Sequence, residues 1–399
     1  MRIPTKPLPR MEYIILMSAI VAVDALAIDA ILPALSFMSE YFRLDNDNQR
    51  QYIVTSIFAG YALGVLFFGV ASDSFGRKRP IYLGFGLFLL GTIVTIFATS
   101  FNMLIIGRIL QGMGAAGPQI IPTAITRDIY KGRGMAEIMS LIMMVFLLIP
   151  AIAPFLGQLV LQIWNWQGIF IVLAVYSLFA LTWFALRQPE TLPPESRVPF
   201  SFRQVISSAQ AVLTNNRAMK YTLAEGFAFA AVLAYLSTAQ QVFQDHFQLG
   251  EKFPLYFGSL ALVMVVSSYL NSRLVERLGM KYLVTLGACI LFTLSLFYLA
   301  FVLFNNAIVP LWSFMLYASS AYFCLGILFG NMHSMAMEQV GEVAGVAASV
   351  VGSLSTIIAT AIAAFVGSFY NDSVTPIILS FAVLMVPIIY IAASDDVTS

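Results

Sequence analysis

Long apolar runs separated by short polar breaks fill most of the sequence. The first, residues 11–38, is longer than the roughly 20 residues that a helix needs to cross the hydrocarbon core of a bilayer. Read in the same way, the chain contains twelve such runs, and each predicts a membrane-spanning helix. Their expected bounds are 11–38, 48–70, 80–99, 101–125, 138–161, 165–186, 218–242, 253–272, 280–304, 309–335, 344–367 and 374–393.

The longest polar interruption, residues 187–217, lies between the sixth and seventh runs. Its prolines indicate a linker, and the residues that follow them predict a short amphipathic helix along the inner membrane surface. We therefore expect an all-α membrane protein with two six-helix bundles, residues 1–186 and 218–399. Two such halves are the general plan of many secondary transporters.

The composition agrees with a membrane protein and excludes several other classes. Hydrophobic residues make up 60% of the chain and charged residues only 10%, whereas about a quarter of the residues in a soluble domain carry charge. A net charge of +1 gives no basic field for nucleic acid. The sequence has no phosphate-binding loop, metal-ligand cluster or nucleophile elbow. We therefore expect neither an enzyme nor a bound metal or cofactor, and no direct use of ATP.

The basic residues indicate the orientation of the spans. Apart from Arg108, they fall in the segments on the same side as the N-terminus, and only Arg43, Arg50 and Lys252 fall in the opposite loops. By the positive-inside rule we expect both termini and residues 187–217 in the cytoplasm, with the spans in a bacterial inner membrane. The first run is too long for a signal peptide and lacks a small-residue cleavage site, so it predicts a retained helix.

The loop after the second span, residues 69–80, reads GVASDSFGRKRP and resembles the Gly-x-x-x-Asp-x-x-Gly-Arg-Lys signature of the major facilitator superfamily. Its glycines permit close packing and a tight turn, and its charges can bond neighbouring helix ends in one conformation and release them in another. The alternative is a basic loop that only sets topology, but the acid and the glycines have no role in topology. The matching residues, interpreted as a conformational gate, are Gly69, Asp73, Gly76, Arg77, Lys78 and Arg79.

The fourth span contains RILQGMGAAGPQIIP, residues 108–122, which resembles the Arg-x-x-Gln-Gly-x-Gly motif of proton-coupled members of that family. The matching residues are Arg108, Gln111, Gly112 and Gly114. An arginine inside a membrane helix is expensive, so it indicates a functional site with a partner or a hydrated cavity. The alternative is that Arg108 reaches the outer surface, about seven residues or roughly 10 Å away.

The first span contains AIDAILPAL, which resembles the Asp-x-x-x-x-Pro pattern of drug:proton antiporters, most closely their bicyclomycin and chloramphenicol resistance branch. Asp29 is the matching acid, and it lies at a depth similar to that of Arg108, so the two can meet. Asp24 lies five residues earlier, a turn of about 140°, and cannot share a narrow face with Asp29. Two roles stay open for Asp24: lining a cavity or bonding a neighbouring helix.

The fifth span contains LLIPAIAPFLGQLV, residues 147–160, which is similar to the proline-and-glycine motif of family antiporters. Pro150, Pro154 and Gly157 match it, whereas Ala153 and Gln158 stand where glycine is usual. The prolines permit a bend and Gly157 permits close helix packing. The linker entrance, residues 189–194, also resembles that branch.

Two polar residues of the second half are further candidates. Glu225, about seven residues into the seventh span, is either a second proton- or cation-binding group or a hydrated charge near the cytoplasmic end. His333 lies among methionines near the end of the tenth span, where it either contacts substrate or belongs to an adaptable packing surface.

The resemblance implies a twelve-helix major facilitator fold, with spans 1, 4, 7 and 10 around a cavity. It implies a monomer that exports a drug-like or amphipathic molecule in exchange for protons, with membrane lipid around it, Asp29 as the proton acceptor and Arg108 as its regulator. The first alternative is a carrier dedicated to one natural solute, such as a siderophore or an amino acid. A membrane sensor or an intramembrane enzyme is disfavoured, because the sequence shows neither a soluble domain nor a catalytic cluster.

Overall fold

The computed structural model describes residues 8–338 and 344–394, and every regular element in this part of the chain is a helix. Among the described residues, eleven helices are long and apolar enough to cross a membrane. A further helix, α5 (Phe101–Ile129), is 29 residues long but contains Arg108 and Gln111, which make it less apolar. The predicted all-α membrane fold is confirmed. The two chain ends on which the predicted topology depends lie outside the described residues.

The chain forms two compact units, and it passes between them more than once. The first comprises the residues up to Arg43 together with Ser56–Ser207, and the second comprises Leu44–Thr55 and the residues from Ser208 onward. A short segment before and at the start of the second span is thus grouped with the second unit, which the apolar pattern alone does not indicate.

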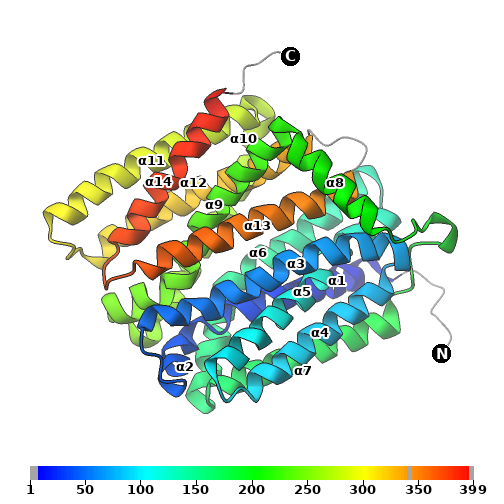
Figure 1. The fold of residues 1–399 in the computed structure, drawn as a ribbon, viewed down its shortest axis with the longest axis horizontal. Coiled ribbons are helices and arrows are strands. Elements are labelled where there is room, and N and C mark those ends of the chain that lie inside the picture. The colour runs from blue at the N-terminus through cyan, green and yellow to red at the C-terminus, as the bar shows by residue number, and fades with distance from the viewer. Residues whose placement is uncertain (1–7, 339–343, 395–399) are drawn as a thin grey trace. The chain divides into compact units, whose positions relative to one another are not determined.

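The first unit is built around α1 (Arg10–Asp29), which packs against α5, α6 and α7. Figure 1 shows α4, α5 and α7 side by side, in agreement with the contacts of α4 with both neighbours. The other elements of this unit are η1 (Leu32–Ala34), α2 (Leu35–Tyr41), most of α3 (Gln51–Phe75), α4 (Lys78–Ile96), α6 (Gly132–Ile163), α7 (Trp166–Arg187) and η3 (Pro194–Ser196).

Glycines allow α5 to approach two neighbouring helices at once. A Cβ atom placed at Gly112 would lie 1.8 Å from the carbonyl oxygen of Ile57 on α3. One placed at Gly114 would lie 2.2 Å from the backbone nitrogen of Phe88 on α4. Close backbone approach of this kind is how small residues stabilise helix contacts in membranes, where the hydrophobic effect between helices is weak. The glycines of the Arg108 motif therefore fix α5 between α3 and α4.

The first span is not one continuous helix, because α1 ends at Asp29 and η1 and α2 follow. Pro33 has no N–H to donate to the carbonyl of Asp29, which lies four residues earlier. The chain instead makes a short turn in which the N–H of Ala34 donates to the carbonyl of Ile31, at 2.8 Å. The candidate acid Asp29 therefore stands at the end of a helix.

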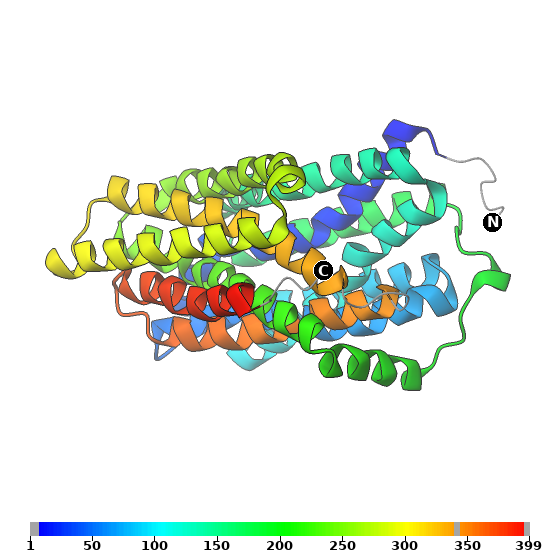
Figure 2. The ribbon, with the colours of Figure 1, turned by 90° about the horizontal axis from the view of Figure 1, so that it is seen from above.

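The second unit is built around α9 (Asn216–Gln240), which packs against α12, α13 and α14. Figure 2 shows α11, α12 and α14 as neighbouring yellow, golden-yellow and red helices, and α11 contacts both of the others. The other elements are η2 (Asp47–Arg50), the π-helical η4 (Gln241–His246), η5 (Gly250–Lys252), α10 (Phe253–Leu278), α11 (Met280–Phe304), α12 (Leu311–Glu338), α13 (Ala344–Ser368) and α14 (Thr375–Ser394). The helix α8 (Phe202–Thr214) contains the boundary between the units.

Polar side chains mark the helix starts that separate the spans. Ser100, Asn165 and Asn215 each accept a hydrogen bond from a backbone N–H in the first turn of α5, α7 and α9. Such caps satisfy donors that the helix itself leaves unpaired. The predicted starts of these spans, residues 101, 165 and 218, lie within two residues of the observed ones.

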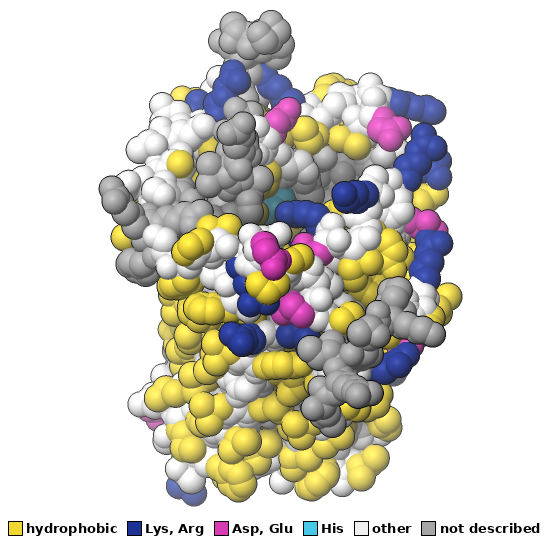
Figure 3. Space-filling model, turned by 90° about the vertical axis from the view of Figure 1, so that its right-hand side faces the viewer, with side chains coloured by type: hydrophobic (Ala, Val, Ile, Leu, Met, Phe, Trp, Pro, Cys, Tyr) yellow, Lys and Arg dark blue, Asp and Glu magenta, His cyan; other side chains and the backbone are white. Residues whose placement is uncertain are grey.

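The surface has the character expected of helices that face lipid. Large apolar side chains such as Phe297, Phe304 and Tyr390 are more than two-thirds exposed. On the face shown in Figure 3, Lys and Arg side chains gather in one part and hydrophobic side chains form a broad area in another. A soluble monomer rarely exposes so much contiguous apolar surface. The chain is a multi-pass membrane protein.

Candidate functional site

Arg108 is fully buried, with 0% of its surface exposed, so it does not reach the outer surface. Its Nη1 atom donates to the carbonyl of Ala27 on α1, at 3.1 Å, and to Oε1 of Gln111, at 2.9 Å. Gln111 is itself held by a hydrogen bond from its Nε2 to Oγ1 of Thr92 on α4, at 2.8 Å. The guanidinium also lies 5.8 Å from the ring centroid of Phe170. Three helices besides α5 thus fix its position.

The helix α1 carries two buried acids, and Asp24 is the one that interacts electrostatically with the Arg108 guanidinium. Asp24 is 7% exposed and Asp29 is 4% exposed. Arg108 contacts the backbone of Ala27, two residues before Asp29, so α5 meets α1 at the level of this acid. An ionised Asp24 attracts the Arg108 guanidinium and repels an ionised Asp29 on the same helix. Asp24 therefore stands between the two electrostatically, which the spacing along the first span does not reveal.

The proline-and-glycine motif of α6 packs onto the break in the first span. A Cβ atom placed at Gly157 would lie 1.8 Å from the carbonyl oxygen of Ala30, the residue after Asp29. Pro150 and Pro154 are both accommodated inside α6, which remains helical from Gly132 to Ile163. This motif therefore contacts the backbone next to the candidate proton acceptor.

The gating motif is organised around Arg77, which is 6% exposed. Its Nε and Nη2 atoms donate to the two carboxylate oxygens of Asp128 at the end of α5, at 2.8 and 3.2 Å. Its Nη1 atom donates to Oδ1 of Asp73, at 2.6 Å, and to Oγ of Ser72, at 3.2 Å. The Ser72 hydroxyl in turn donates to the carbonyl of Gly69, at 3.1 Å. Arg77 thus joins the end of α3 to the end of α5.

Glu190 of the linker closes the other side of the same motif. It accepts hydrogen bonds from the backbone N–H groups of Arg77 and Lys78, at 2.8 and 3.1 Å, at the start of α4. A carboxylate is favourable at a helix N-terminus, where N–H groups are unpaired. Gly76 has a φ of +86°, and a Cβ there would lie 2.7 Å from Oε2 of Glu190. Glycine is therefore required at this turn. Arg79 is exposed.

Burial alone would lower the pKa of Arg77, but the hydrogen bonds that it donates to Asp128 and Asp73 raise the pKa above its usual value. The guanidinium is therefore a permanent charge, and only a change of conformation can release its partners. Neither Asp128 nor Glu190 was a predicted site residue. Asp128 lies three residues after a predicted span end, beside Arg127. Glu190 lies in the linker entrance, residues 189–194, whose resemblance to the drug:proton antiporter branch is the signal that could have identified it.

Glu225 is buried, with 3% of its surface exposed, which disfavours the interpretation as a hydrated charge. Its Oε1 atom lies 2.9 Å from Nδ1 of His333 on α12, and its Oε2 atom accepts from Oγ of Ser355 on α13, at 3.1 Å. The structure thus brings together the two candidates that the sequence offered separately for the second half. Ser355 was not predicted.

Arg50, assigned from the sequence to an outer loop, is 5% exposed. Its Nη2 atom forms an ion pair with Oδ2 of Asp245, at 2.6 Å, and its Nη1 atom donates to Oε1 of Gln240, at 2.9 Å. The neighbouring Gln51 donates to Oε1 of Gln241, at 2.6 Å. All these residues belong to the second unit, and none of these contacts was predicted.

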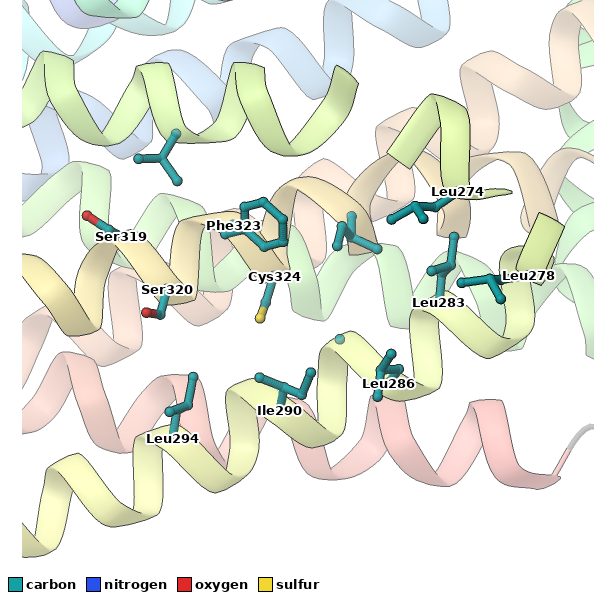
Figure 4. Close-up of a pocket in the computed structure, with 13 residues that line it drawn as sticks. Leu274, Leu278, Leu283, Leu286, Ile290, Leu294, Ser319, Ser320, Phe323 and Cys324 are labelled. Carbon is teal, nitrogen blue, oxygen red and sulfur yellow. The ribbon is translucent and has the colours of Figure 1, made fainter. Parts of the chain in front are cut away.

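An apolar cavity of about 570 Å³ lies between α10, α11 and α12 of the second unit (Figure 4). Leucine and isoleucine side chains line most of it, together with Phe323, Cys324 and two serines. Cys324 is a free thiol, as is Cys289. The lining contains no charged group, so this cavity is separate from the candidate proton-binding residues. Among the described residues, no group of three or more His, Cys, Asp or Glu side chains is placed to hold a metal ion.

Comparison with known proteins gives a consistent result. The sequence pattern of the Major Facilitator Superfamily matches residues 17–393. The bicyclomycin resistance protein homolog of Haemophilus influenzae is 26% identical over 384 residues, which cover 94% of this chain and 93% of that protein. Multidrug resistance protein D of Escherichia coli K12 is 29% identical over 205 residues, which cover 50% of this chain and 51% of that protein.

Solved structures share the fold at much lower identity. The human organic anion transporter MFSD10 superposes with a TM-score of 0.72 at 15% identity, covering 97% of this chain and 100% of that one. The xylose transporter XylE of E. coli, in a partially occluded inward open conformation, gives 0.71 at 12% identity, covering 96% and 98%. Their different substrates show that the shared fold does not determine what is carried.

Proposed function

Because this chain belongs to the Major Facilitator Superfamily, we propose that it exports a drug-like or amphipathic small molecule in exchange for protons. It is a transporter and not an enzyme. Two relatives whose names refer to bicyclomycin resistance and multidrug resistance support the choice of substrate class. The proposed location is the inner membrane of a bacterium, with both termini in the cytoplasm, because the basic loop residues favour that orientation.

The observation that carries the proposal is the fully buried Arg108, which contacts α1 at Ala27, on the helix that carries the buried acids Asp24 and Asp29. Ionisable groups inside a membrane are costly, and where they persist they commonly mark proton and ion pathways. Asp29 is the proposed proton acceptor, Asp24 couples it to Arg108, and Arg108 changes the proton affinity of the cluster when its surroundings change. A proton taken up from outside and released inside would then drive export of the substrate on the return step.

The proposed gate is the Arg77 cluster. Arg77 bonds Asp73 and Asp128 in this conformation, and charge-assisted bonds of this kind are about twice as strong as neutral ones. Breaking them together would release the ends of α3 and α5. The cluster therefore stabilises one conformation of the transport cycle without contacting the substrate.

A carrier dedicated to one natural solute uses the same machinery and is the alternative function. Purified protein in proteoliposomes tests the proposal directly. An imposed pH gradient should drive uptake of ethidium or chloramphenicol into vesicles that are acidic inside, and addition of the compound should release protons from them. A panel of unrelated compounds that each raise the melting temperature favours a drug exporter, whereas a single stabilising solute favours the dedicated carrier. Absence of any proton movement with a transported compound would contradict exchange.

A further inference from the structure

The second unit contains a buried acid that is bonded from two different helices. Glu225 on α9 pairs through Oε1 with His333 of α12 and through Oε2 with Ser355 of α13. Its side chain is 4% exposed, whereas that of His333 is 44% exposed. The imidazole therefore extends from an accessible surface to a carboxyl group that solvent does not reach. The proton exchange proposed for Asp29 uses none of these three residues.

Ser355 can serve both protonation states of Glu225. Its Oγ atom lies 2.8 Å from the carbonyl of Val351 and 3.1 Å from Oε2 of Glu225. A hydroxyl has one proton to donate and can also accept. It donates to Oε2 when the carboxylate is ionised. When a proton arrives on Oε1 from the His333 side, Oε2 is still an acceptor and Ser355 keeps its bond to it, so Oε2 is paired in both states.

His333 provides a route for the proton. A neutral imidazole carries a proton on one ring nitrogen and a lone pair on the other. A proton that binds Nε2 allows the proton on Nδ1 to move across 2.9 Å to Oε1 of Glu225. The ring is again neutral, with its tautomer exchanged, and the carboxylate has become a carboxyl group. The reverse sequence releases the proton.

Other charged residues that the structure describes on the helices packed against this pair lie on α9, α12 and α10; on α10 they are Arg273, Glu276 and Arg277, after the Asn271 that bonds Asn331 of α12. Among the described residues, Glu225 is the titratable group that hydrogen-bonds and electrostatically attracts the His333 imidazole. The helix that supplies Ser355, α13, has no titratable residue in its sequence. The nearest ionisable residues along α9 and α12 are Tyr221, a buried phenol one helical turn before Glu225, Lys220 before it, and Glu338 five residues after His333.

We propose that Glu225, His333 and Ser355 form a second proton-binding site, with Glu225 as the acceptor, His333 as the relay and Ser355 as a positioning residue. Proton binding at this site does not depend on the function proposed above, whereas its use in transport rests on that function. The chain would then have one proton site in each unit.

Infrared difference spectroscopy of the full chain in lipid, recorded after a downward pH step, tests the site without a substrate. We expect a carboxyl C=O band that is lost in Glu225→Gln, retained in Asp29→Asn and retained in the control Glu338→Gln, whose acid is exposed on α12. In His333→Gln the band should form at least about ten-fold more slowly than in the wild type, because the relay is missing. In Ser355→Ala the band should shift in frequency.

Each result decides one part of the proposal. A band that Glu225→Gln leaves intact overturns the site. A band that forms at the wild-type rate in His333→Gln overturns the relay. If Glu225→Gln does not fold, histidine-selective ¹⁵N NMR takes the place of that variant. The chain has only two histidines, so the Nδ1 resonance of His333 can be compared between the wild type and Ser355→Ala. An unchanged resonance through the pH step then overturns the shared proton. If the wild type shows the Glu225 band but no band that Asp29→Asn removes, only the exchange proposed above is contradicted.

Discussion

Gly157 on α6 and Ala30 at the break of the first span are in backbone contact, since a Cβ at Gly157 would lie 1.8 Å from the Ala30 carbonyl oxygen. Because Ala30 directly follows Asp29, the packing of α6 determines where this acid is held. The short distance involves backbone atoms and cannot be relieved by rotating a side chain. This contact links the proline-and-glycine motif to the proposed proton acceptor.

Replacing Gly157 by alanine should therefore move α6 away from the break. We expect Gly157→Ala to lower the free energy of unfolding by about 1–3 kcal/mol, the usual cost of overpacking, and to impair transport. The matched control is Gly134→Ala on the same helix, where a Cβ meets nothing within 4 Å. That change should be neutral or stabilise by up to about 1 kcal/mol, because alanine is the better helix former. Melting temperatures and pH-driven transport measure both effects, and equal behaviour of the two variants would contradict the contact.

Asp29→Asn should abolish transport driven by a pH gradient while leaving substrate exchange across the membrane intact. Asparagine keeps nearly the same volume and stays neutral, but it cannot bind and release a proton. Proteoliposomes separate the two activities, because exchange of labelled for unlabelled substrate needs no net proton movement. Retention of full pH-driven transport by Asp29→Asn would place the proton elsewhere, with Asp24→Asn and Glu225→Gln as the next variants to measure.

The depth of residues along single helices could be predicted, but their partners across helices could not. Counting residues along the first and fourth spans brought Arg108 close to Asp29, and the structure places it against Ala27. The same reasoning could not show that Asp24 acts on Arg108, because periodicity gives no information on which neighbouring helix covers a face. Arg108 itself was recognised because an intramembrane arginine is rare.

Contacts distant in sequence account for the rest of what was missed. Glu190 lies 113 residues from Arg77, and His333 lies 108 residues from Glu225. Arg50 looked like an ordinary loop residue because it lies at the outer end of the apolar run 48–70, and only the fold buries it. Helix lengths follow from local hydrophobicity, whereas these partners follow from how the helices are packed, which a single sequence does not encode locally.

The Arg77 cluster predicts a graded effect of its two acids. Asp128 makes two bonds to the guanidinium and its side chain is 16% exposed, whereas Asp73 makes one and is 42% exposed. We therefore expect Asp73→Asn to impair transport and Asp128→Asn to impair it further, with normal membrane insertion in both. Transport rates and the amount of protein in the membrane are the two measurements. A wild-type rate and unchanged substrate affinity in both variants would show that the cluster has no gating role.

The orientation of the linker can be tested at Phe200, which is exposed in the segment before α8. Cys289 and Cys324 are first replaced by serine, and Phe200→Cys then provides a single reactive thiol. We expect an impermeant maleimide to label it in inside-out vesicles and not in intact cells, because the basic residues around the linker favour the cytoplasm. Labelling from outside intact cells would overturn the proposed topology.

The ion pair between Arg50 and Asp245 gives the last prediction. Arg50 is 5% exposed, and removing its partner leaves a buried guanidinium with less compensation, so Asp245→Asn should destabilise the second unit. Because the Asp245 side chain is 35% exposed, water replaces part of the lost interaction, and we expect a cost of about 1–3 kcal/mol. The matched control is Asp45→Asn, which replaces an exposed acid five residues before Arg50. This change should leave the melting temperature unchanged.

A double-variant comparison separates this pair from a general effect of charge. Arg50→Gln alone and Asp245→Asn alone should each lower the melting temperature, and the combination should be about as stable as the worse single variant, because the second change removes a group that has already lost its partner. Strictly additive losses would show that the two side chains do not stabilise each other. If instead Asp245→Asn behaves like Asp45→Asn, Gln240, which accepts from the same guanidinium, holds Arg50 without the acid.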